Sequence, residues 1–394
     1  MSILEIFLVV VAVAWVVLGV RVIVGVVMMR PLPGLASSAP TDDPPTVSVI
    51  IAVRDEGARI EKTVRQVMGQ AGVKLELVVA DDRSTDETPG ILARLAQEFA
   101  ALRVIRIEEL PANWLGKCHA MHVASQQASG EWLVFTDGDV WMRPETVARA
   151  VSAARATGAG HVTLTPDFTA AERMSVPFQS SMLVFMVLFN LEMSRANLDR
   201  RNAMCGVGAF NLVRGDVYRS FGGHQALRLE IADDLKMGLL VGRAGHRSRA
   251  FLGHELIQAD WASDVRGLLK ALEKNAFVGM NYSVTRLVLI TVMFMCMWLG
   301  GLLGAFTNTW AGYAATLAMA PFVMGAVMQA RRLRWPIGAA LLVPFTVVVI
   351  IAVFWNSAIT LLRQGGVRWR DTFYPLDLLR ANLITTGKSG PFSV

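Results

Sequence analysis

The sequence contains little cysteine and little charge, and each shortage excludes a class of protein. Cysteine occurs only 3 times in 394 residues, in an odd-numbered set without metal-site spacing: Cys118, Cys205 and Cys296. These residues imply no disulfide framework and fit a reducing cytoplasmic face. Charged residues make up 18% of the chain, whereas an ordinary soluble domain has roughly 25%. The composition therefore argues against a disulfide-stapled secreted domain and against a fully soluble one.

The positive charge in the chain is not arranged for a nucleic acid. The formal net charge is +6, but Lys and Arg form no stripe interleaved with aromatic side chains. Positive charge beside apolar segments indicates membrane topology and contact with anionic lipids. We therefore expect a membrane partner and no nucleic-acid partner.

Apolar residues are in excess, at 53% of the chain, and they concentrate at its two ends. Residues 3–29 are apolar apart from Glu5 and Arg21, and about 20 such residues span a bilayer. A cleaved signal peptide is the competing interpretation, but its apolar core would be about 7–15 residues long. We therefore predict a transmembrane anchor over residues 1–30, followed by a Pro/Ser-rich linker over residues 31–46.

A second set of apolar stretches lies over residues 285–362. It predicts about three membrane helices, the last of them interrupted by Pro344, before a basic tail over residues 363–394. Between the two ends, the apolar run at residues 176–192 is too short to span a bilayer, so it predicts an interfacial or core helix.

The distribution of Lys and Arg predicts the orientation in an inner or plasma membrane. Short loops rich in Lys and Arg stay cytoplasmic, so Arg30, the region after it, residues 331–334 and the tail are expected inside, with the N-terminus outside. A single crossing by residues 336–362 would instead carry the tail outside. A re-entrant segment, or a hairpin broken at Pro344, would resolve this conflict.

Residues 47–284 show a different periodicity, in which short apolar runs alternate with helical spacing. The pattern predicts strands at residues 47–53, 76–80, 102–107 and 132–135, and helices at residues 56–70, 86–99 and 117–127. Strands that alternate with helices of this length indicate an α/β domain with a mostly parallel sheet. In such sheets ligands bind at the carboxyl ends of the strands, and the acidic motifs of this chain fall at those ends or in the loops that follow.

The first two acidic motifs each follow a predicted strand. In DDRSTD at residues 81–86, a carboxylate can accept hydrogen bonds from the imide of uracil or from ribose hydroxyls, but the same residue types also cap helices. In DGD at residues 137–139, two carboxylates leave room for Mg²⁺ or Mn²⁺ bridging to a diphosphate. The same tripeptide is also an ordinary turn, so both motifs keep a structural alternative.

Asp233 and Asp234 form the third motif, at the start of a helical stretch. In a carboxylate pair near bound substrate, one pKa can be raised, as a general base requires. Acidic residues that complement the helix macrodipole are the alternative. Each motif is ambiguous alone, but the three together are much harder to explain by chance.

In order and spacing, these motifs and VSVIIAVRDE at residues 47–56 resemble the family 2 glycosyltransferases with a GT-A fold. Finer features are similar to the ceramide glucosyltransferase-like, hopanoid- and carotenoid-associated branch: WLGK at 114–117, GVGAFNLVRGDVYRSFGG at 206–223 followed by His224, and GVRWRDTFY at 366–374. The likeness covers residues 1–375. It implies a cytoplasmic Rossmann-like GT-A catalytic domain over residues 47–284, with one N-terminal and about three C-terminal transmembrane helices.

The resemblance also implies an enzymatic activity and a set of site residues. The implied reaction is the inverting, metal-dependent transfer of a sugar from a nucleotide donor, expected to be a UDP-sugar, to a hydroxyl of a ceramide-like, hopanoid, carotenoid or diacylglycerol lipid. Glu56 and Asp82 would line the nucleoside pocket, Asp137 and Asp139 would hold Mg²⁺ or Mn²⁺ and the diphosphate, and Asp234 with Asp233 would supply the base. Lys117 is a further candidate for contact with phosphate.

The chain departs from the family pattern at three places. The first predicted strand ends in Arg54-Asp55-Glu56, where Asn-Glu is more common. The usual Glu-Asp pair is Asp233-Asp234 here, which shortens one side chain by a methylene. The Gln-x-x-Arg-Trp motif of related enzymes is missing before the C-terminal helices, and Arg368-Trp369 is the candidate replacement.

Two other functions and one competing metal site are alternatives to this prediction. A processive polysaccharide synthase would need more membrane helices and the missing motif, and a non-catalytic membrane sensor of sugar nucleotides should have lost acidic residues that are all present. His119 and His122 are three apart on a predicted helix and resemble a metal pair, but a packed helix face is the favoured interpretation.

Overall fold

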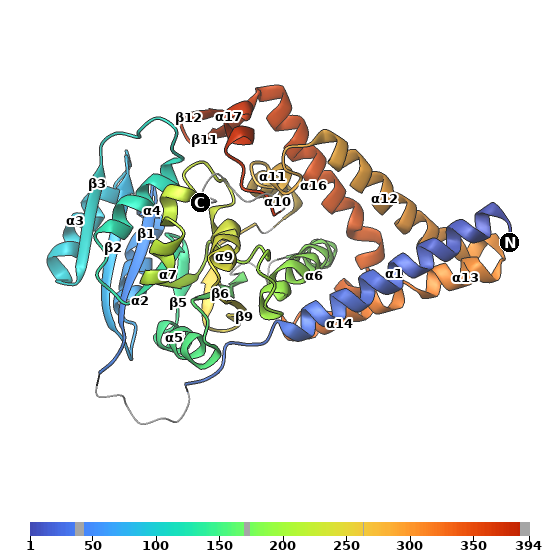
Figure 1. The fold of residues 1–394 in the computed structure, drawn as a ribbon, viewed down its shortest axis with the longest axis horizontal. Coiled ribbons are helices and arrows are strands. Elements are labelled where there is room, and N and C mark those ends of the chain that lie inside the picture. Colours follow the sequence, from blue (N-terminus) through green and yellow to red (C-terminus); the bar gives the residue numbers. More distant parts are fainter. Residues whose placement is uncertain (36–42, 169–173, 263, 387–394) are drawn as a thin grey trace. The chain divides into compact units, whose positions relative to one another are not determined.

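The computed structural model describes residues 1–35, 43–168, 174–262 and 264–386. Within it the chain forms two compact units, which we describe separately (Figure 1). The α/β unit comprises Arg30–Thr169, Arg195–Asp260 and Asn382–Val394. The helical unit comprises Met1–Met29, Ala170–Ser194 and Trp261–Ala381.

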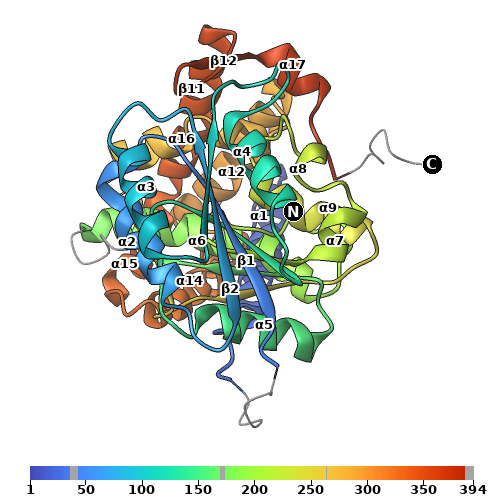
Figure 2. The same ribbon diagram turned by 90° about the vertical axis from the view of Figure 1, so that its left-hand side faces the viewer.

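The α/β unit is built on a seven-stranded sheet with the order β3-β2-β1-β4-β8-β6-β9 (Figures 1 and 2). Its first half consists of parallel strands and their connecting helices: β1 (Thr46–Val53), α2 (Gly57–Met68), β2 (Lys74–Asp82), α3 (Thr88–Glu98), β3 (Leu102–Ile107), α4 (Gly116–Gln126) and β4 (Trp132–Asp137). All four predicted strands and three predicted helices of residues 47–135 are present. The predicted α/β class with a mostly parallel sheet is therefore confirmed.

Side chains on both faces of this sheet are buried. Val49 and Ile51 of β1 belong to a core cluster with residues of α2 and α3, whereas Ile50 belongs to a second cluster with residues of α4. Successive strand residues point to opposite faces, so helices cover the sheet on both sides. This explains why the strand reads as a continuous apolar run.

The second half of the sheet comes from both sides of the apolar helix α6 (Val176–Asn197). It contains β6 (His161–Thr165), β8 (Asn211–Arg214), which runs antiparallel to β4 and β6, and β9 (Ser248–Leu252). Four helices, α5 (Thr146–Thr157), α7 (Gly215–Ser220), α8 (Gly223–Ala226) and α9 (Asp233–Arg243), and a small sheet of β5 (Val140–Met142), β10 (Ile257–Ala259) and β7 (Asp167–Phe168) complete the unit. Residues that precede and follow α6 thus share one sheet.

Part of the predicted linker is packed instead of free. Leu32 is buried in the core cluster, and its N–H donates to the carbonyl oxygen of Leu252 at 3.0 Å. Arg149 donates to the carbonyl oxygen of Pro33 at 2.9 Å. The prediction of an unpacked linker is wrong for residues 31–33, because Leu32 supplies apolar area to the edge of the sheet; residues 36–42 lie outside the described part of the chain.

Five segments of the described chain are long and apolar enough to cross a membrane: Ile3–Met28, Val176–Asn197, Val284–Thr307, Trp310–Arg332 and Val343–Gln364. They correspond to α1 (Ile3–Met28), α6, α12 (Val284–Leu303) with η2 (Gly304–Thr307), α13 (Trp310–Leu317) with α14 (Ala320–Arg332), and α16 (Val343–Gln364). One N-terminal and three C-terminal segments were predicted and are present. Pro344 stands in the first turn of α16, where its missing N–H costs no helical hydrogen bond, so it begins this helix and does not break it.

The helix α6 is longer than its apolar run predicted. It covers 22 residues, so the expectation that this segment is too short to span a bilayer is wrong. Its polar last turn, Ser194–Asn197 in the sequence, extends the helix beyond the apolar run. Because the residues before and after it pair in one sheet, a single crossing by α6 would separate neighbouring strands. A core or interfacial position remains the interpretation consistent with the sheet.

The boundaries of the C-terminal regions also differ from prediction. The second part of the α/β unit ends at Asp260, not at residue 284, because α10 (Val265–Leu272) and α11 (Ala276–Gly279) belong to the helical unit. There Phe277 N donates to Ser357 Oγ of α16 at 3.0 Å. The basic tail is folded over residues 366–381, as a hairpin of β11 (Gly366–Trp369) and β12 (Thr372–Pro375) followed by the helix α17 (Leu376–Ala381).

Candidate active site

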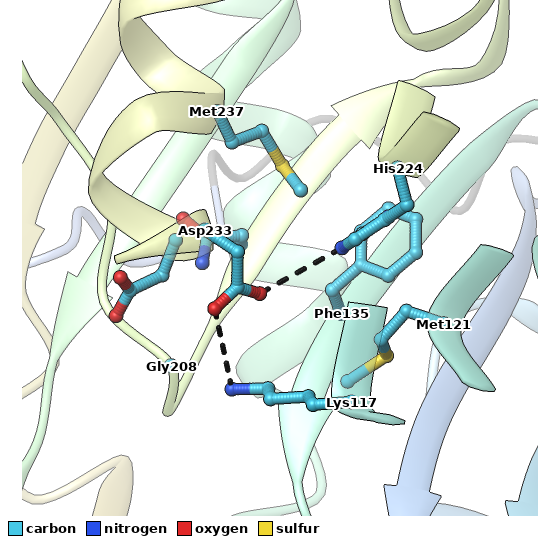
Figure 3. A pocket seen from close by; sticks show the side chains of 9 residues that line it. Lys117, Met121, Phe135, Gly208, His224, Asp233 and Met237 are labelled. Carbon is cyan, nitrogen blue, oxygen red and sulfur yellow. Dashed lines mark ion pairs between the residues drawn. The ribbon is translucent and has the colours of Figure 1, made fainter. Parts of the chain in front are cut away.

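Three of the predicted site residues line one pocket of the α/β unit, and a fourth, Asp137, contacts Lys117 of that pocket. Asp137 ends β4, Lys117 stands in the first turn of α4, and Asp233 and Asp234 begin α9. The pocket is lined by Lys117, Met121, Phe135, Gly208, Asn211, His224, Asp233, Asp234 and Met237 (Figure 3). Asp137 contacts this group through Lys117, so residues about 120 positions apart in the sequence share one site at the carboxyl end of a central strand.

Lys117 is the cation of this acidic site. Its Nζ lies 2.7 Å from Asp137 Oδ1 and 4.0 Å from Asp233 Oδ1. Burial alone would lower the pKa of Lys117, but Asp137, Asp233 and Asp234 together hold that pKa well above its usual value. The ammonium group therefore stays charged and balances part of the carboxylate charge.

Asp234 has the electrostatic character expected of a base. Burial, together with the neighbouring Asp233 carboxylate, raises the pKa of Asp234 to about 6, against the opposing effect of Lys117. A carboxylate poised near the working pH can accept a proton more readily than one with an ordinary pKa. Asp234 Oδ1 also accepts the N–H of Leu235 at 2.7 Å, so its orientation is fixed by the start of α9.

His224 is the main pocket residue that the sequence did not single out. It is 1% exposed, and its Nε2 lies 3.8 Å from Asp233 Oδ2 (Figure 3). Its Nδ1 lies 2.8 Å from the Tyr218 hydroxyl, which also accepts the His224 N–H at 2.9 Å. Burial lowers the pKa of His224, so the ring is neutral at physiological pH. Its place after the glycines of residues 206–223 was the available signal, and it came through the resemblance alone.

Asp139 and Glu56 lie close to Asp137 and are not part of the pocket lining. Burial, with Asp137 and Glu56 nearby, raises the pKa of Asp139 to about 6. Arg59 stands 3.6 Å from Glu56 Oε2 and 2.9 Å from Asp260 Oδ2. Three carboxylates, of Glu56, Asp137 and Asp139, thus crowd one edge of the site, and a bound cation would relieve their mutual repulsion.

The donor set fits a divalent ion that shares its ligands with a substrate. Within the described residues, no group of three or more His, Cys, Asp or Glu side chains is placed to hold a metal ion by itself. Mg²⁺ and Mn²⁺ in nucleotide sites take one or two carboxylates together with phosphate oxygens. Asp137 and Asp139 match this requirement, and the raised pKa of Asp139, caused by burial and by the Asp137 and Glu56 carboxylates, fits a site that binds a cation.

Asp82 occupies a different position from the pocket residues. It is buried at the end of β2, and its two oxygens accept from Arg83 Nε at 2.8 Å and Arg83 Nη2 at 3.1 Å. A Cβ on Gly116 would overlap Asp82 Oδ2, so the carboxylate lies against the start of α4, next to Lys117. Asp82 therefore adjoins the site, and its predicted contact with a nucleoside stays a prediction, as does that of Glu56.

Gly208 explains why the main chain can pass between the two acidic motifs. A Cβ at this position would overlap Asp137 Oδ2 and would lie 3.6 Å from Asp234 Oδ2. Only a residue without a side chain fits this close approach. His119 and His122 pack their rings against Trp114, at centroid distances of 5.4 and 5.0 Å, in agreement with the favoured packed helix face.

A mostly parallel sheet with a DxD motif that begins at the last residue of β4 and an acidic pair at the start of α9 is the arrangement of a GT-A glycosyltransferase domain. Residues 48–222 match the family model described as Glycosyl transferase family 2, so the α/β unit carries a family 2 glycosyltransferase domain. The predicted family is confirmed for this domain.

The curated relatives are glycosyltransferases of carotenoid type. The chain is 24% identical over 194 residues to a 4,4'-diaponeurosporenoate glycosyltransferase of Staphylococcus aureus (strain bovine RF122 / ET3-1), covering 49% of this chain and 50% of that protein. The same enzyme of strain USA300 is 24% identical over 193 residues, with 49% and 50% covered. The chain thus spans about half the length of the curated relatives it matches.

A solved structure supports the fold. The mannosyltransferase of Pyrobaculum calidifontis, in complex with GDP-Man and Mn²⁺, superposes with a TM-score of 0.57 at 19% identity, covering 92% of this chain and 99% of that one. At this identity the likeness establishes the GT-A fold. The predicted fold class is therefore confirmed by a second comparison.

Proposed function

We propose that this protein is an inverting, metal-dependent glycosyltransferase that moves a sugar from a UDP-sugar to a hydroxyl of a membrane lipid. The observation that carries this proposal is the convergence of Lys117, Asp137, Asp233 and Asp234 at the carboxyl end of β4. The matched relatives are named for a carotenoid acceptor, and five segments of this chain are apolar enough to cross a membrane. A carotenoid acceptor fits both facts, and a ceramide-like, hopanoid or diacylglycerol acceptor fits the second.

The pocket residues divide the chemistry between leaving group and acceptor. Asp137 and Asp139 would hold Mg²⁺ or Mn²⁺, which when bound neutralises charge on the departing nucleotide. Lys117, which forms an ion pair with Asp137 in this structure, would then face the diphosphate. Asp234 accepts the proton of the acceptor hydroxyl while the acceptor oxygen bonds to the anomeric carbon. At the same time, the bond from that carbon to the diphosphate oxygen breaks. Displacement in one step inverts the anomeric centre.

His224 and Lys117 face the two oxygens of the Asp233 carboxylate, next to the base in sequence. His224 Nε2 faces Asp233 Oδ2 at 3.8 Å, and Lys117 faces the other oxygen of the same carboxylate at 4.0 Å. Within the described residues, His224 Nε2 has no hydrogen-bond partner. A substrate hydroxyl or water placed there can bridge His224 and Asp233.

A transfer assay tests the proposal directly. The purified protein in detergent, with Mn²⁺ and either UDP- or GDP-sugars, is incubated with a lipid extract, and the products are analysed by mass spectrometry. We expect a lipid product whose mass is increased by one sugar, and we expect its formation to require the metal ion. A polymeric product would instead indicate a polysaccharide synthase, and the absence of product with every donor would overturn the proposal.

Contacts inside the helical unit support a cytoplasmic location for the end of α1. Arg332 donates to the carbonyl oxygens of Val26 and Met29, the latter at 2.9 Å, so the basic loop 331–334 lies at the end of α1. From this end the chain continues directly into the α/β unit. Because basic loops stay inside, we place the α/β unit at the cytoplasmic face of the inner or plasma membrane, with the N-terminus outside.

The third C-terminal apolar segment, residues 336–362, then enters and leaves the membrane on the cytoplasmic side. Residues 384 and 385 accept hydrogen bonds from Lys236 and Arg243, so the chain returns to the α/β unit after α16. Trp298 of α12 donates to the carbonyl oxygen of Pro344, and Trp15, midway along α1, donates to that of neighbouring Met297 at 2.7 Å. Pro344 thus lies near mid-depth, and we propose that α15 (Ile337–Leu341) and α16 together form a re-entrant hairpin.

Cysteine labelling tests this topology. In a Cys296→Ser background, a membrane-impermeant maleimide should label Ser2→Cys in intact cells and Thr386→Cys only after the membrane is broken. The two buried cysteines, Cys118 and Cys205, serve as unreactive internal controls. Labelling of Thr386→Cys in intact cells would rule out the re-entrant hairpin.

A further inference from the structure

We propose that the C-terminal segment at residues 382–386 is a positioning element for the Asp233–Asp234 pair, with Glu230 and Lys236 as the positioning residues that bind it. This inference rests on the proposed function. It concerns residues that act through Asp233 and Asp234 and do not touch substrate themselves.

One residue of the segment bridges the two sides of the acidic pair. The Ile384 N–H donates to Glu230 Oε1 at 2.5 Å, and the Ile384 carbonyl oxygen accepts from Lys236 Nζ at 2.5 Å. Glu230 precedes Asp233 by three positions and Lys236 follows Asp234 by two. Arg243, at the end of α9, donates to the next carbonyl oxygen, that of Thr385. The segment therefore clamps both the loop before the pair and the helix after it.

The clamped loop is also fixed from the opposite side, by α4. Cys118 Sγ donates to the carbonyl oxygen of Glu230 at 3.6 Å, and the Leu115 N–H donates to that of Arg228 at 2.8 Å. Leu115 and Cys118 flank Lys117. The loop before Asp233 thus lies between the helix that carries the cation and the C-terminal segment, and loss of either contact would free one side of it.

The apolar part of the clamp reaches the pocket wall. Ile384 packs against the core cluster that contains Met121, Phe135 and Met237. These three residues also line the pocket beside Asp233 (Figure 3). Removing Ile384 would therefore loosen the wall as well as the loop.

The polar part of the clamp is too deeply buried to be left without the segment. Glu230 is 2% exposed and Lys236 is 4% exposed. Burial raises the pKa of Glu230 to about 7, while Lys236 and the Ile384 N–H oppose the shift. A buried polar group that loses its hydrogen-bond partner destabilises the folded protein. Without the segment, the loop is expected to rearrange so that water reaches these groups, and the carboxylates of Asp233 and Asp234 move with it.

Two truncations of the full chain test the proposal. Deletion of residues 387–394 should leave transfer unchanged, because the clamp remains. Deletion of residues 382–394 should lower kcat by about 10- to 100-fold, since a displacement near 1 Å can have an effect of this size. The Kd for the nucleotide sugar with Mn²⁺, measured by calorimetry, should stay within about twofold, because a residue that acts on the base affects kcat and not donor binding.

If the longer truncation does not fold, two point variants of Ile384 test the positioning role of the segment. Ile384→Pro removes the N–H that Glu230 accepts, whereas Ile384→Val keeps both the N–H and an apolar side chain. We expect a lower kcat with an unchanged donor Kd for the first and near-native values for the second. Equal kcat for Ile384→Pro and Ile384→Val, or a parallel loss of donor binding, would overturn the positioning role. If the intact chain transfers no sugar, that result contradicts the proposed function and is distinct from the results that would overturn the positioning role.

Discussion

Replacing Asp234 with asparagine should lower the rate of sugar transfer to a lipid hydroxyl by about 10²–10⁴-fold, with little change in affinity for the nucleotide donor. Asparagine keeps the size of the side chain but cannot accept the proton of the acceptor. Steady-state kinetics with the lipid acceptor, and donor binding measured by calorimetry, would check both parts. Asp377→Asn is a matched control, because the Asp377 side chain is 97% exposed and lies outside the pocket.

The pH dependence of transfer follows from the raised pKa of this carboxyl. Asp234 must be ionised to act as a base, so kcat should fall as the pH decreases through about 6. A second acceptor sharpens the test. A lipid carboxylate is already ionised near pH 7 and needs no base, so transfer to it should survive in Asp234→Asn. Equal loss with hydroxyl and carboxylate acceptors would show that the substitution damages the site and does not remove a base.

The raised pKa of Asp234 affects stability in the direction opposite to its effect on activity. A carboxyl whose pKa is about 6 in the folded protein, against about 3.9 in an unfolded chain, binds its proton more tightly when folded. Stability therefore falls as the pH rises between these two values. Asp234 and Asp139 both carry this cost, which is expected of residues retained for chemistry and not for folding.

The first half of the sheet was predictable because its strands are short apolar runs, and β1 and β4 are buried on both faces. The apolar run predicted at residues 47–53 became β1 (Thr46–Val53), and the run at 102–107 became β3 without change. The acidic motifs at the ends of such strands were therefore predictable as neighbours. The sequence predicted that Lys117 contacts phosphate, but it did not predict the ion pairs of Lys117 with Asp137 and Asp233. No local pattern encodes a contact between α4 and α9.

The remaining features depend on pairings between distant residues. The strand β8 has only 4 residues, too few to show a period, and its direction is set by pairing with β4 and β6. The bond between Ile384 and Glu230 joins residues 154 positions apart, and each looks unremarkable in its own segment. Leu32 was assigned to a linker because a single apolar residue among prolines has no periodicity. In each case the partner, and not the segment, determines the structure.

Replacing Asp139 with asparagine should abolish the Mn²⁺-dependent stabilisation of the protein by UDP. A ligand at about 100 times its Kd stabilises the folded state by roughly 2.7 kcal/mol, which a thermal melt in detergent resolves readily. We expect this gain for the native chain and its loss in Asp139→Asn and Asp137→Asn, since each variant leaves one carboxylate for the ion. Chelation with EDTA should remove the gain from the native chain and leave the variants unchanged.

The ligand-free protein should respond to the same substitution in the opposite direction. Above pH 7, the Asp139 carboxylate is ionised against burial and against Asp137 and Glu56. Asparagine removes that repulsion, so ligand-free Asp139→Asn should melt at the same temperature as the native chain or higher. The full difference between a pKa of about 6 and about 3.9 sets an upper bound of roughly 3 kcal/mol. A variant that is more stable alone but no longer stabilised by Mn²⁺ and UDP has lost a metal ligand. One that is less stable under both conditions has lost its fold instead, and the assignment of Asp139 to the metal would be wrong.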